Sequence, residues 1–320
     1  MAQTTAWDLV VVGGAYTDYV VRGPRLPVQG ETTLGNKFLE TAGGKGANQA
    51  VAAARLGARV ALVSRVGNDA RGDEILTSLQ HERVDTRYVR RDPEVSTGLS
   101  LIQLNEQAHK QMMVWLGACY GLTIEDVQHA EEACSNAKVV LTQLEAPLDV
   151  IMTAMRIGHK AHALVILDPA PAPPHAFPDD LFSLVDIIRP DSKEAETITG
   201  VNVRDRESAH RAAEQLLQRG VRASAIQAGE EGDLLLWPDG SCWLPRIPIK
   251  SIDTTGAGDA FVAALAVALS EGQTLMEAGP FASAAAALTT TKLGARPALP
   301  RREAALELLQ KRKSVTAQER

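Results

Sequence analysis

Short apolar runs alternate along the 320-residue chain with stretches of helical patterning, and this alternation constrains the fold most strongly. Each run is short and continuously hydrophobic, as expected for strands buried on both faces of a parallel sheet. The runs are 9–12, 60–63, 139–141, 164–167 and 185–188. Two of the predicted helices, 47–56 and 207–218, are closely followed by Gly57 and Gly220, the residue type that commonly terminates a helix. We therefore predict a single α/β domain over residues 1–320, with a doubly wound, mostly parallel central sheet flanked by helices.

Two segments interrupt this alternation and supply no crossover helix. Residues 16–39 are rich in Gly, Pro and Thr, and 97–104 with 111–116 have the pattern of a hairpin of extended strands. We predict that segments at about 16–42 and 95–118 form a small β-sheet, a lid over a ligand at the carboxyl ends of the main strands. The alternative is that both segments are ordinary surface excursions.

Composition and charge narrow the class of partner. A formal net charge of -6 provides no basic surface of the kind that binds nucleic acid or anionic lipid, so we expect a small-molecule partner. The three cysteines, Cys119, Cys134 and Cys242, lie far apart without metal or redox spacing, which favours a reducing cytoplasm. No stretch approaches the roughly 20 apolar residues of a membrane span, and no leader pattern precedes the first strand, so we expect a cytoplasmic protein without a membrane partner.

A glycine-rich turn near the C-terminus is the most informative motif. Residues 253–259 read Asp-Thr-Thr-Gly-Ala-Gly-Asp and lead into an apolar helix. Gly256 and Gly258 allow a tight turn, so backbone N–H groups and the positive end of the helix dipole converge on one anion site. Such a site suits a phosphoryl group in transfer, and Asp259 is placed to take the proton of an attacking hydroxyl. The alternative is that Asp259 merely caps the helix.

Two common phosphate-binding loops are excluded. A Walker-type loop requires Ser or Thr after Gly-Lys, but Gly44-Lys45 is followed by Gly46. A dinucleotide-binding fingerprint requires a third glycine, whereas Phe261 occupies that position after Gly256 and Gly258.

A second glycine cluster and several acids complete the candidate site. Residues 43–48 open the first helix, where Lys45 and Asn48 offer donors to hydroxyl groups; the alternative is that these glycines only permit tight packing. Asp18 and Glu145 each follow a predicted strand, where a carboxylate would grip neighbouring sugar hydroxyls. The remaining acids, Asp191 and Glu194, have a spacing that suits either a hydrated magnesium ion or a helix cap.

Taken together, these motifs resemble the ribokinase-like, or PfkB-type, carbohydrate kinases, and the resemblance covers nearly the whole chain. It is carried by four segments in the family's order: 43–50, 143–147, 168–171 and 253–259. The resemblance implies an ATP-dependent kinase that phosphorylates a primary hydroxyl of a small sugar, with D-ribose, giving ribose 5-phosphate, as the leading expectation. It also implies Mg²⁺, an activating monovalent cation, usually K⁺, and a homodimer formed through the lid, where Leu99, Leu101 and Leu104 would provide one apolar face.

The resemblance also implies a role for each matching residue. Asp259 would be the base, and Gly256, Ala257 and Gly258 the anion hole. The sugar would be surrounded by Asp18, Tyr16, Gly43, Gly44, Lys45, Asn48, Glu145 and Asp259. The nucleotide would lie along Asp191, Gln227, Gly229, Gly232, Gly258 and Ser283, with Glu194 and Asp191 near magnesium. The monovalent cation would be held by Asp253, Thr255, Thr289, Lys292 and Gly294.

Several positions depart from the family pattern and leave other hypotheses open. These are Tyr16, Cys119, Asp191, Gln227, Ser283 and Ala298. Tyr16 replaces an asparagine that would bind sugar and is able to stack on a flat ring, so a nucleoside kinase, or a kinase of another sugar such as fructose, is the alternative enzyme. Asp191 adds negative charge near the phosphates, which favours a third hypothesis, a catalytically silent protein that binds sugar or nucleotide.

Overall fold

The candidate site lies at the carboxyl ends of the strands of the main sheet. The computed structural model describes residues 7–172 and 177–318, with side chains described up to Arg312. Within these ranges the sheet has nine strands in the order β13-β12-β11-β10-β9-β8-β1-β4-β5. The strands are β1 (Trp7–Val12), β4 (Val60–Gly67), β5 (Val89–Asp92), β8 (Ala137–Gln143), β9 (Leu164–Asp168), β10 (Ile187–Ile188), β11 (Ala223–Ala228), β12 (Gly232–Trp237) and β13 (Gly240–Pro245). Pairing is parallel from β5 to β11, and β12 and β13 add an antiparallel extension.

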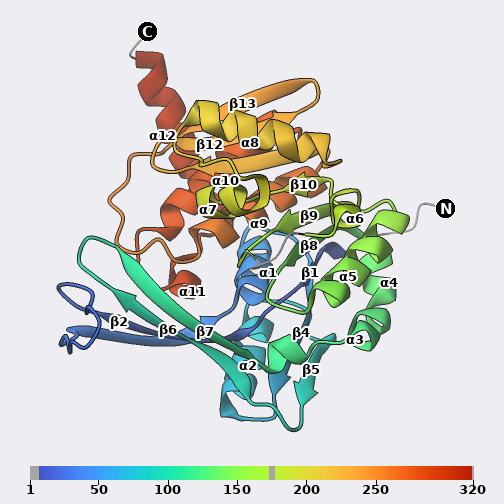
Figure 1. Cartoon of the computed structure of the whole chain (residues 1–320), viewed down its shortest axis with the longest axis vertical. Coiled ribbons are helices and arrows are strands. Elements are labelled where there is room, and N and C mark those ends of the chain that lie inside the picture. Colours follow the sequence, from blue (N-terminus) through green and yellow to red (C-terminus); the bar gives the residue numbers. More distant parts are fainter. Residues whose placement is uncertain (1–6, 173–176, 319–320) are drawn as a thin grey trace.

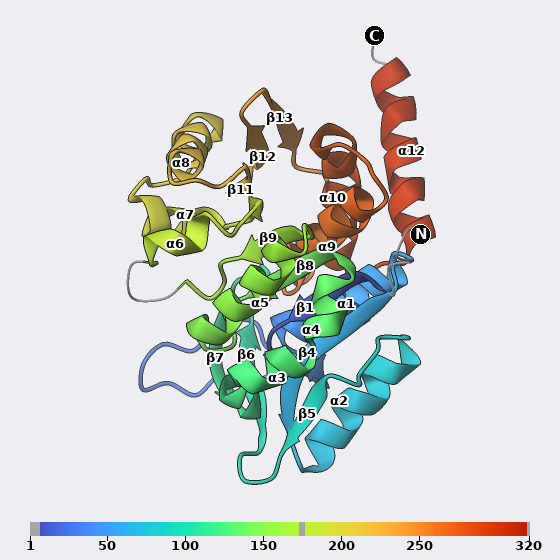
Figure 2. The ribbon, with the colours of Figure 1, turned by 90° about the vertical axis from the view of Figure 1, so that its right-hand side faces the viewer.

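Helices cover both faces of this sheet, so the predicted doubly wound architecture is confirmed (Figures 1 and 2). One face packs against α1 (Lys45–Arg55), α2 (Ala70–His81), α9 (Ala257–Ser270), α10 (Leu275–Thr289) and α12 (Arg302–Gln318). The other packs against α3 (Ile124–His129), α4 (Glu131–Ser135), α5 (Leu148–Lys160), α6 (Asp179–Phe182), α7 (Ser192–Thr199) and α8 (Arg206–Gln218). Two short elements, the 3₁₀ helix at Ala118–Gly121 and α11 (Ala295–Ala298), lie in connections.

The apolar helix that follows the glycine-rich turn lies at the centre of the first layer. Every residue of α9 from Asp259 to Ala268 is buried, because the helix packs between α1, α10 and the sheet. This environment explains why α9 is hydrophobic all round rather than amphipathic. Within the described ranges, no helix combines the length and apolar character needed to cross a membrane.

Four strands form the smaller sheet, which confirms the predicted lid sheet. They are β2 (Tyr16–Arg22), β3 (Lys37–Gly43), β6 (Thr97–Leu104) and β7 (Lys110–Gly117), in the order β3-β2-β6-β7. The sheet projects from the body of the molecule beside the carboxyl ends of the main strands (Figure 1). We refer to it as the lid sheet.

The register of the lid sheet decides which of its residues share a face. Leu101 pairs with Met113 and is half exposed, and Leu99 pairs with Trp115. Leu104 is 1% exposed, so the prediction that it belongs to the same apolar face is wrong. The physical reason is that side chains alternate along a strand, and residues 101 and 104 therefore point to opposite faces.

Some elements differ from their predicted bounds. The strand predicted over 185–188 is reduced to Ile187–Ile188, and α1 begins two residues early, at Lys45. Strand β5 was not predicted, because its central residues are Arg90 and Arg91 rather than an apolar run. Nor was the β12–β13 extension, which lies outside the repeating strand and helix pattern.

Candidate active site

The turn before α9 leaves backbone N–H groups free at the helix N-terminus. Gly256 has φ of 81°, in the left-handed region, and a Cβ at this position would lie 2.7 Å from the Cβ of Ala295. Among the described residues, the N–H groups of Gly256 and Gly258 have no acceptor, whereas that of Ala257 donates to the Thr254 carbonyl at 3.3 Å. The 14-residue helix adds the positive end of its dipole, so the turn has the geometry and charge that suit an anion.

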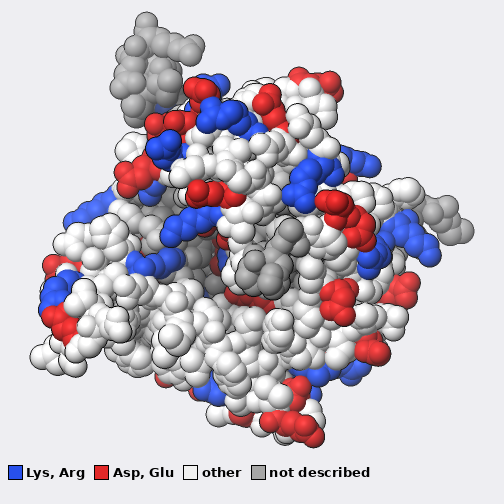
Figure 3. All heavy atoms as spheres, viewed as in Figure 1, with Lys and Arg blue, Asp and Glu red and all other residues white. Residues whose placement is uncertain are grey.

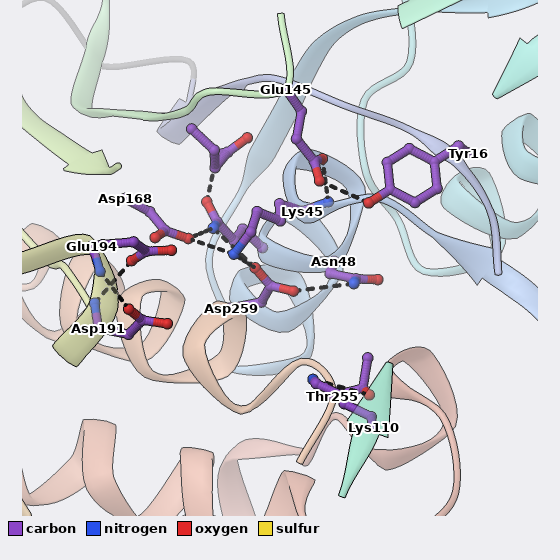
Figure 4. Close-up of polar contacts among 12 residues, drawn as sticks. Tyr16, Lys45, Asn48, Lys110, Glu145, Asp168, Asp191, Glu194, Thr255 and Asp259 are labelled. Atoms are coloured by element: carbon purple, nitrogen blue, oxygen red, sulfur yellow. Dashed lines mark hydrogen bonds and ion pairs between the residues drawn. The ribbon is translucent and has the colours of Figure 1, made fainter. Parts of the chain in front are cut away.

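Asp259, in the first turn of α9, directs its carboxylate at side chains of α1 (Figure 4). Its Oδ2 accepts a hydrogen bond from Asn48 at 3.1 Å, and its Oδ1 accepts one from Gln49 at 3.1 Å. Burial raises the pKa of Asp259, while the Lys45 ammonium, 4.0 Å from Oδ1, acts in the opposite direction. The carboxylate is therefore held in place and is more basic than an exposed aspartate.

Lys45 joins Asp259 to a second buried acid. Its Nζ lies 3.4 Å from Oδ2 of Asp168, which also accepts a hydrogen bond from Gln49 at 2.8 Å. Burial alone would lower the pKa of Lys45, but the charges of Asp168 and Asp259 outweigh it and raise the pKa, so the side chain stays protonated. Asp168 and Gln49 lie within the family-like segments 168–171 and 43–50, but neither was predicted as a site residue.

Glu145 anchors the start of α1 and contacts Tyr16. Its two carboxylate oxygens accept hydrogen bonds from the Tyr16 hydroxyl and from the backbone N–H of Lys45, each at 2.7 Å. Burial raises the pKa of Glu145 to about 7, although Lys45 opposes this shift. Tyr16 is itself buried, so in this structure its hydroxyl is committed to Glu145.

The glycines of the second cluster permit close packing of two loops. Gly44 has φ of 87°, and a Cβ on it would lie 2.6 Å from the carbonyl oxygen of Gly14. A Cβ on Gly46 would similarly lie 2.6 Å from the backbone of Gly13. A Cβ on Gly43 would collide with the carboxylate of Asp18. The packing interpretation of these glycines therefore holds, and the same packing brings Lys45 and Asn48 to the site.

Asp18 reaches the site from the lid sheet rather than from a strand end of the main sheet. It is the third residue of β2, and its carboxylate accepts a hydrogen bond from the Ser100 hydroxyl on the neighbouring strand β6. Asp18 follows β1 in the chain, as predicted, and because the chain enters β2 at Tyr16, its carboxylate lies within a strand of the lid sheet. Burial raises the pKa of Asp18 to about 6.

Two cations that the sequence analysis missed also lie at the site. Arg296, on α11, is 5% exposed and donates from Nε to Oδ1 of Asn48 at 3.3 Å, which leaves the Asn48 amide to face Asp259. Lys110, at the start of β7, reaches across from the lid sheet to the Thr255 hydroxyl at 3.3 Å. Burial lowers the pKa of Arg296 to about 10, and partial desolvation at the cleft lowers that of Lys110, a residue that is otherwise exposed. Neither residue belongs to a recognisable local motif.

A cleft of about 350 Å³ opens beside Asp259. Figure 3 shows the hollow, with Lys and Arg side chains on its rim. All predicted nucleotide residues line it: Asp191, Gln227, Gly229, Gly232, Gly258 and Ser283. Lys45 and residues 256–259 line it too, whereas Tyr16, Asp18, Asn48 and Glu145 are buried next to it and do not contribute to its wall.

Asp191 and Glu194 form a reciprocal cap at the start of α7. The Asp191 carboxylate accepts from the N–H of Glu194 at 2.8 Å, and the Glu194 carboxylate accepts from the N–H of Asp191 at 2.8 Å. Burial raises the pKa of Glu194 to about 7. Among the described residues, no group of three or more His, Cys, Asp or Glu side chains could hold a metal ion, so these two acids fit magnesium only through water or phosphate.

Asp253 is a fully buried carboxylate without a side-chain cation within ion-pair distance among the described residues. Its Oδ1 accepts from the backbone and hydroxyl of Thr255, and its Oδ2 accepts from the N–H of Gly294 at 2.8 Å. Thr289 is also fully buried, whereas Lys292 is exposed. A buried carboxylate without a paired cation is a ligand type that fits a monovalent cation.

Comparison with known proteins identifies the family. The family model described as pfkB family carbohydrate kinase matches residues 7–302. The chain is 37% identical to a ribokinase of Haemophilus influenzae over 94% of this chain and 98% of that protein, and 32% identical to a deoxyribokinase of Salmonella typhi over 81% and 84%. A solved structure described as Arabidopsis thaliana ribokinase complexed with ribose and ATP superposes with a TM-score of 0.83 at 34% identity, covering 95% of this chain and 99% of that one. The chain therefore belongs to the pfkB family of carbohydrate kinases, phosphotransferases that act on an alcohol group.

Proposed function

We propose that this protein is an ATP-dependent ribose kinase that transfers the γ-phosphate of ATP to the primary hydroxyl of D-ribose and releases ribose 5-phosphate. The observation that carries the proposal is the juxtaposition of a buried carboxylate, Asp259, with the free N–H groups of Gly256 and Gly258 at one cleft. A base and an anion site on the same turn suit phosphoryl transfer, in which positioning and electrostatic stabilisation do most of the catalysis.

In the proposed reaction, Asp259 takes the proton of the sugar hydroxyl as the hydroxyl oxygen bonds to the γ-phosphorus. The bond from this phosphorus to the bridging oxygen breaks, and its electron pair leaves with ADP. The N–H groups of the turn bind the phosphoryl oxygens as charge develops on them. The ammonium of Lys45, which lies close to Asp259 and lines the cleft, adds positive charge near the phosphoryl group.

We propose that Mg²⁺ and K⁺ assist this reaction from separate positions. Asp191 and Glu194 at the cleft would contact hydrated Mg²⁺, which neutralises triphosphate charge. Asp253, with carbonyls of the connected segments, would hold K⁺ behind the anion site, and the uncompensated burial of its carboxylate supports this position.

The choice of ribose rests on the relatives named above and on the acids near Asp259. Asp18 and Glu145 provide buried carboxylates of the kind that bind neighbouring hydroxyls. A nucleoside acceptor would require Tyr16 to present its ring to the ligand, but this side chain is 4% exposed and its hydroxyl is bonded to Glu145. The observations therefore favour a small sugar.

A substrate panel tests the proposal. ADP release from ATP is measured with ribose, 2-deoxyribose, fructose and nucleosides, with and without K⁺. We expect the highest kcat/KM with ribose and a higher rate with K⁺. Faster turnover of a nucleoside would overturn the substrate assignment, and binding of ATP and sugar without product would establish the silent binding protein instead.

We further propose that the lid sheet pairs in a homodimer and that the protein is cytoplasmic. The outer face of the lid sheet exposes apolar side chains that the register places together: Val21, Phe38, Leu101, Met113 and Trp115. Met113, 73% exposed, is the obvious position for a charge, and Met113→Glu should convert a dimer into a monomer in sedimentation. A wild-type monomer at micromolar concentration would contradict the dimer. The cytoplasmic location is supported by the three free cysteines.

A further inference from the structure

Arg189 is a buried cation at the cleft that the reaction described above does not use. It follows β10 at the carboxyl edge of the main sheet, and its side chain is 8% exposed. Its Nε has no hydrogen-bond partner among the described residues. Its closest acid is Asp233 on β12, at 3.7 Å from Nη2, which is longer than a hydrogen bond. A buried guanidinium with unused donors is costly unless another group completes its contacts.

The guanidinium lies against the N-terminal turn of α9. A Cβ added at Gly258 would be 2.9 Å from Nη1 of Arg189, so only a glycine leaves room for this approach. The guanidinium carbon lies 5.1 Å from the centre of the Phe261 ring, one turn further along the helix, and this contact orients the side chain. Arg189 and the free N–H groups of Gly256 and Gly258 thus form a positive cluster that faces the cleft.

Asp233 does not account for this arrangement as an ordinary structural ion pair. Burial raises the pKa of Asp233 to about 6, and the charges of Arg189 and Arg246 only partly oppose that shift. A pair that compensated its own burial would have shorter contacts and a carboxylate with a lower pKa. The long contact is better described as a resting position for the guanidinium.

The acidic side chains around the cleft would repel a polyphosphate unless cations such as Arg189 offset their charge. Acidic residues along the wall are Asp168, Asp191, Glu194, Asp233 and Asp259. Of the other cations on the wall, Lys45 is engaged by Asp168 and Asp259, Lys110 contacts the Thr255 hydroxyl, and Arg246 acts on Asp233. The acid at position 191 adds repulsion toward a polyphosphate, and Arg189, two residues earlier, supplies the opposite charge.

We propose that Arg189 is a nucleotide-binding residue, whose guanidinium moves from Asp233 to donate hydrogen bonds to phosphate oxygens that ATP and ADP share, beside the N–H groups of Gly256 and Gly258. This inference rests on the proposed use of ATP. The planar guanidinium of Arg189 carries several N–H donors in a fixed arrangement, which suits bidentate contact with phosphate oxygens.

The test compares a ligand with phosphates and one without them. Dissociation constants for ADP and adenosine are measured by calorimetry for the wild type, Arg189→Gln and Arg189→Lys. The control is Arg222→Gln, which removes an arginine paired with Asp186 at 3.0 Å, at the opposite end of β11. In Arg189→Gln we expect ADP to bind about 10- to 100-fold more weakly and adenosine to change less than about threefold, because only ADP accepts the charged hydrogen bonds. Arg189→Lys should fall in between, and the control should match the wild type.

Equal weakening of ADP and adenosine, an unchanged ADP constant in Arg189→Gln, or absence of ADP binding by the wild type would overturn the proposal. If thermal melting shows that Arg189→Gln is unfolded, the Lys variant decides, because it too must weaken ADP selectively. A wild type that binds ADP with the expected contrast but does not phosphorylate ribose would refute the proposed substrate and leave the role of Arg189 intact.

Discussion

Replacing Asp259 by Asn tests the proposed base with the smallest change of shape. Both carboxylate oxygens accept a hydrogen bond in the structure, from Asn48 and Gln49 at 3.1 Å each, whereas the variant has a single acceptor oxygen. The lost hydrogen bond costs about 1 kcal/mol of stability. This cost is offset because the variant no longer buries a charged carboxylate, the burial that raises the pKa of Asp259. Loss of general-base assistance should lower kcat by about 10²- to 10⁴-fold, or roughly 3–5 kcal/mol in the barrier.

The assay measures ADP release with ribose and ATP, together with calorimetric affinities for ADP and ribose and the melting temperature. Asp149→Asn is the matched control, because Asp149 is an exposed acid in the first turn of α5 and lies outside the cleft. We expect near-normal ligand affinities and melting temperature in Asp259→Asn with greatly reduced kcat. A kcat within tenfold of the wild type would show that another group takes the proton.

Three further predictions concern the turn and its neighbours. In urea unfolding, Gly256→Ala should lower the free energy of unfolding more than Gly272→Ala. Each substitution costs about 1–2 kcal/mol for a left-handed φ, but only a Cβ at position 256 would meet close neighbours. Equal losses in the two variants would contradict the packing at Gly256. In Lys45→Met, the acid limb of the kcat/KM profile should move to higher pH, because the Lys45 ammonium is the strongest of the contacts that oppose burial in raising the pKa of Asp259. An unmoved limb would argue against this coupling. Glu145 has a folded pKa of about 7, raised from 4.5, so its contribution to stability is complete below pH 4.5 and is lost as pH rises through 7. The stability of Glu145→Gln relative to the wild type should therefore increase by up to about 3 kcal/mol between pH 4.5 and 8, and a pH-independent difference would refute the assignment.

The two glycine-rich motifs were predictable because each is a continuous stretch of chain. Gly256, Gly258 and Asp259 lie within four residues, so the turn, the free N–H groups and the acid follow from local backbone geometry alone. Arg189, Lys110 and Arg296 were missed for the opposite reason. Each comes from a different element and approaches the site only through the packing of the lid sheet, β10 and α11 around α9.

For Asp191, the sequence allowed two roles, and the structure was needed to distinguish them. Its spacing from Glu194 suited magnesium or a helix cap, and the structure contains the cap while keeping both residues on the cleft wall. Asp18 lies in the predicted lid segment 16–42 and in β2 of the lid sheet, but its contact with Ser100 was not predictable, because a pattern of extended residues does not state which strands pair.

By itself, the sequence determined the alternation of strands and helices, the two glycine turns and the identity of the acid on the second turn. These features depend on periodicity and on backbone conformations that neighbouring residues control. Only the tertiary structure decided the face on which Leu104 lies, the commitment of Tyr16 to Glu145, and the raised pKa of the buried acids. Desolvation and charge pairing depend on every group brought within a few ångströms, and most of those groups are distant in the chain.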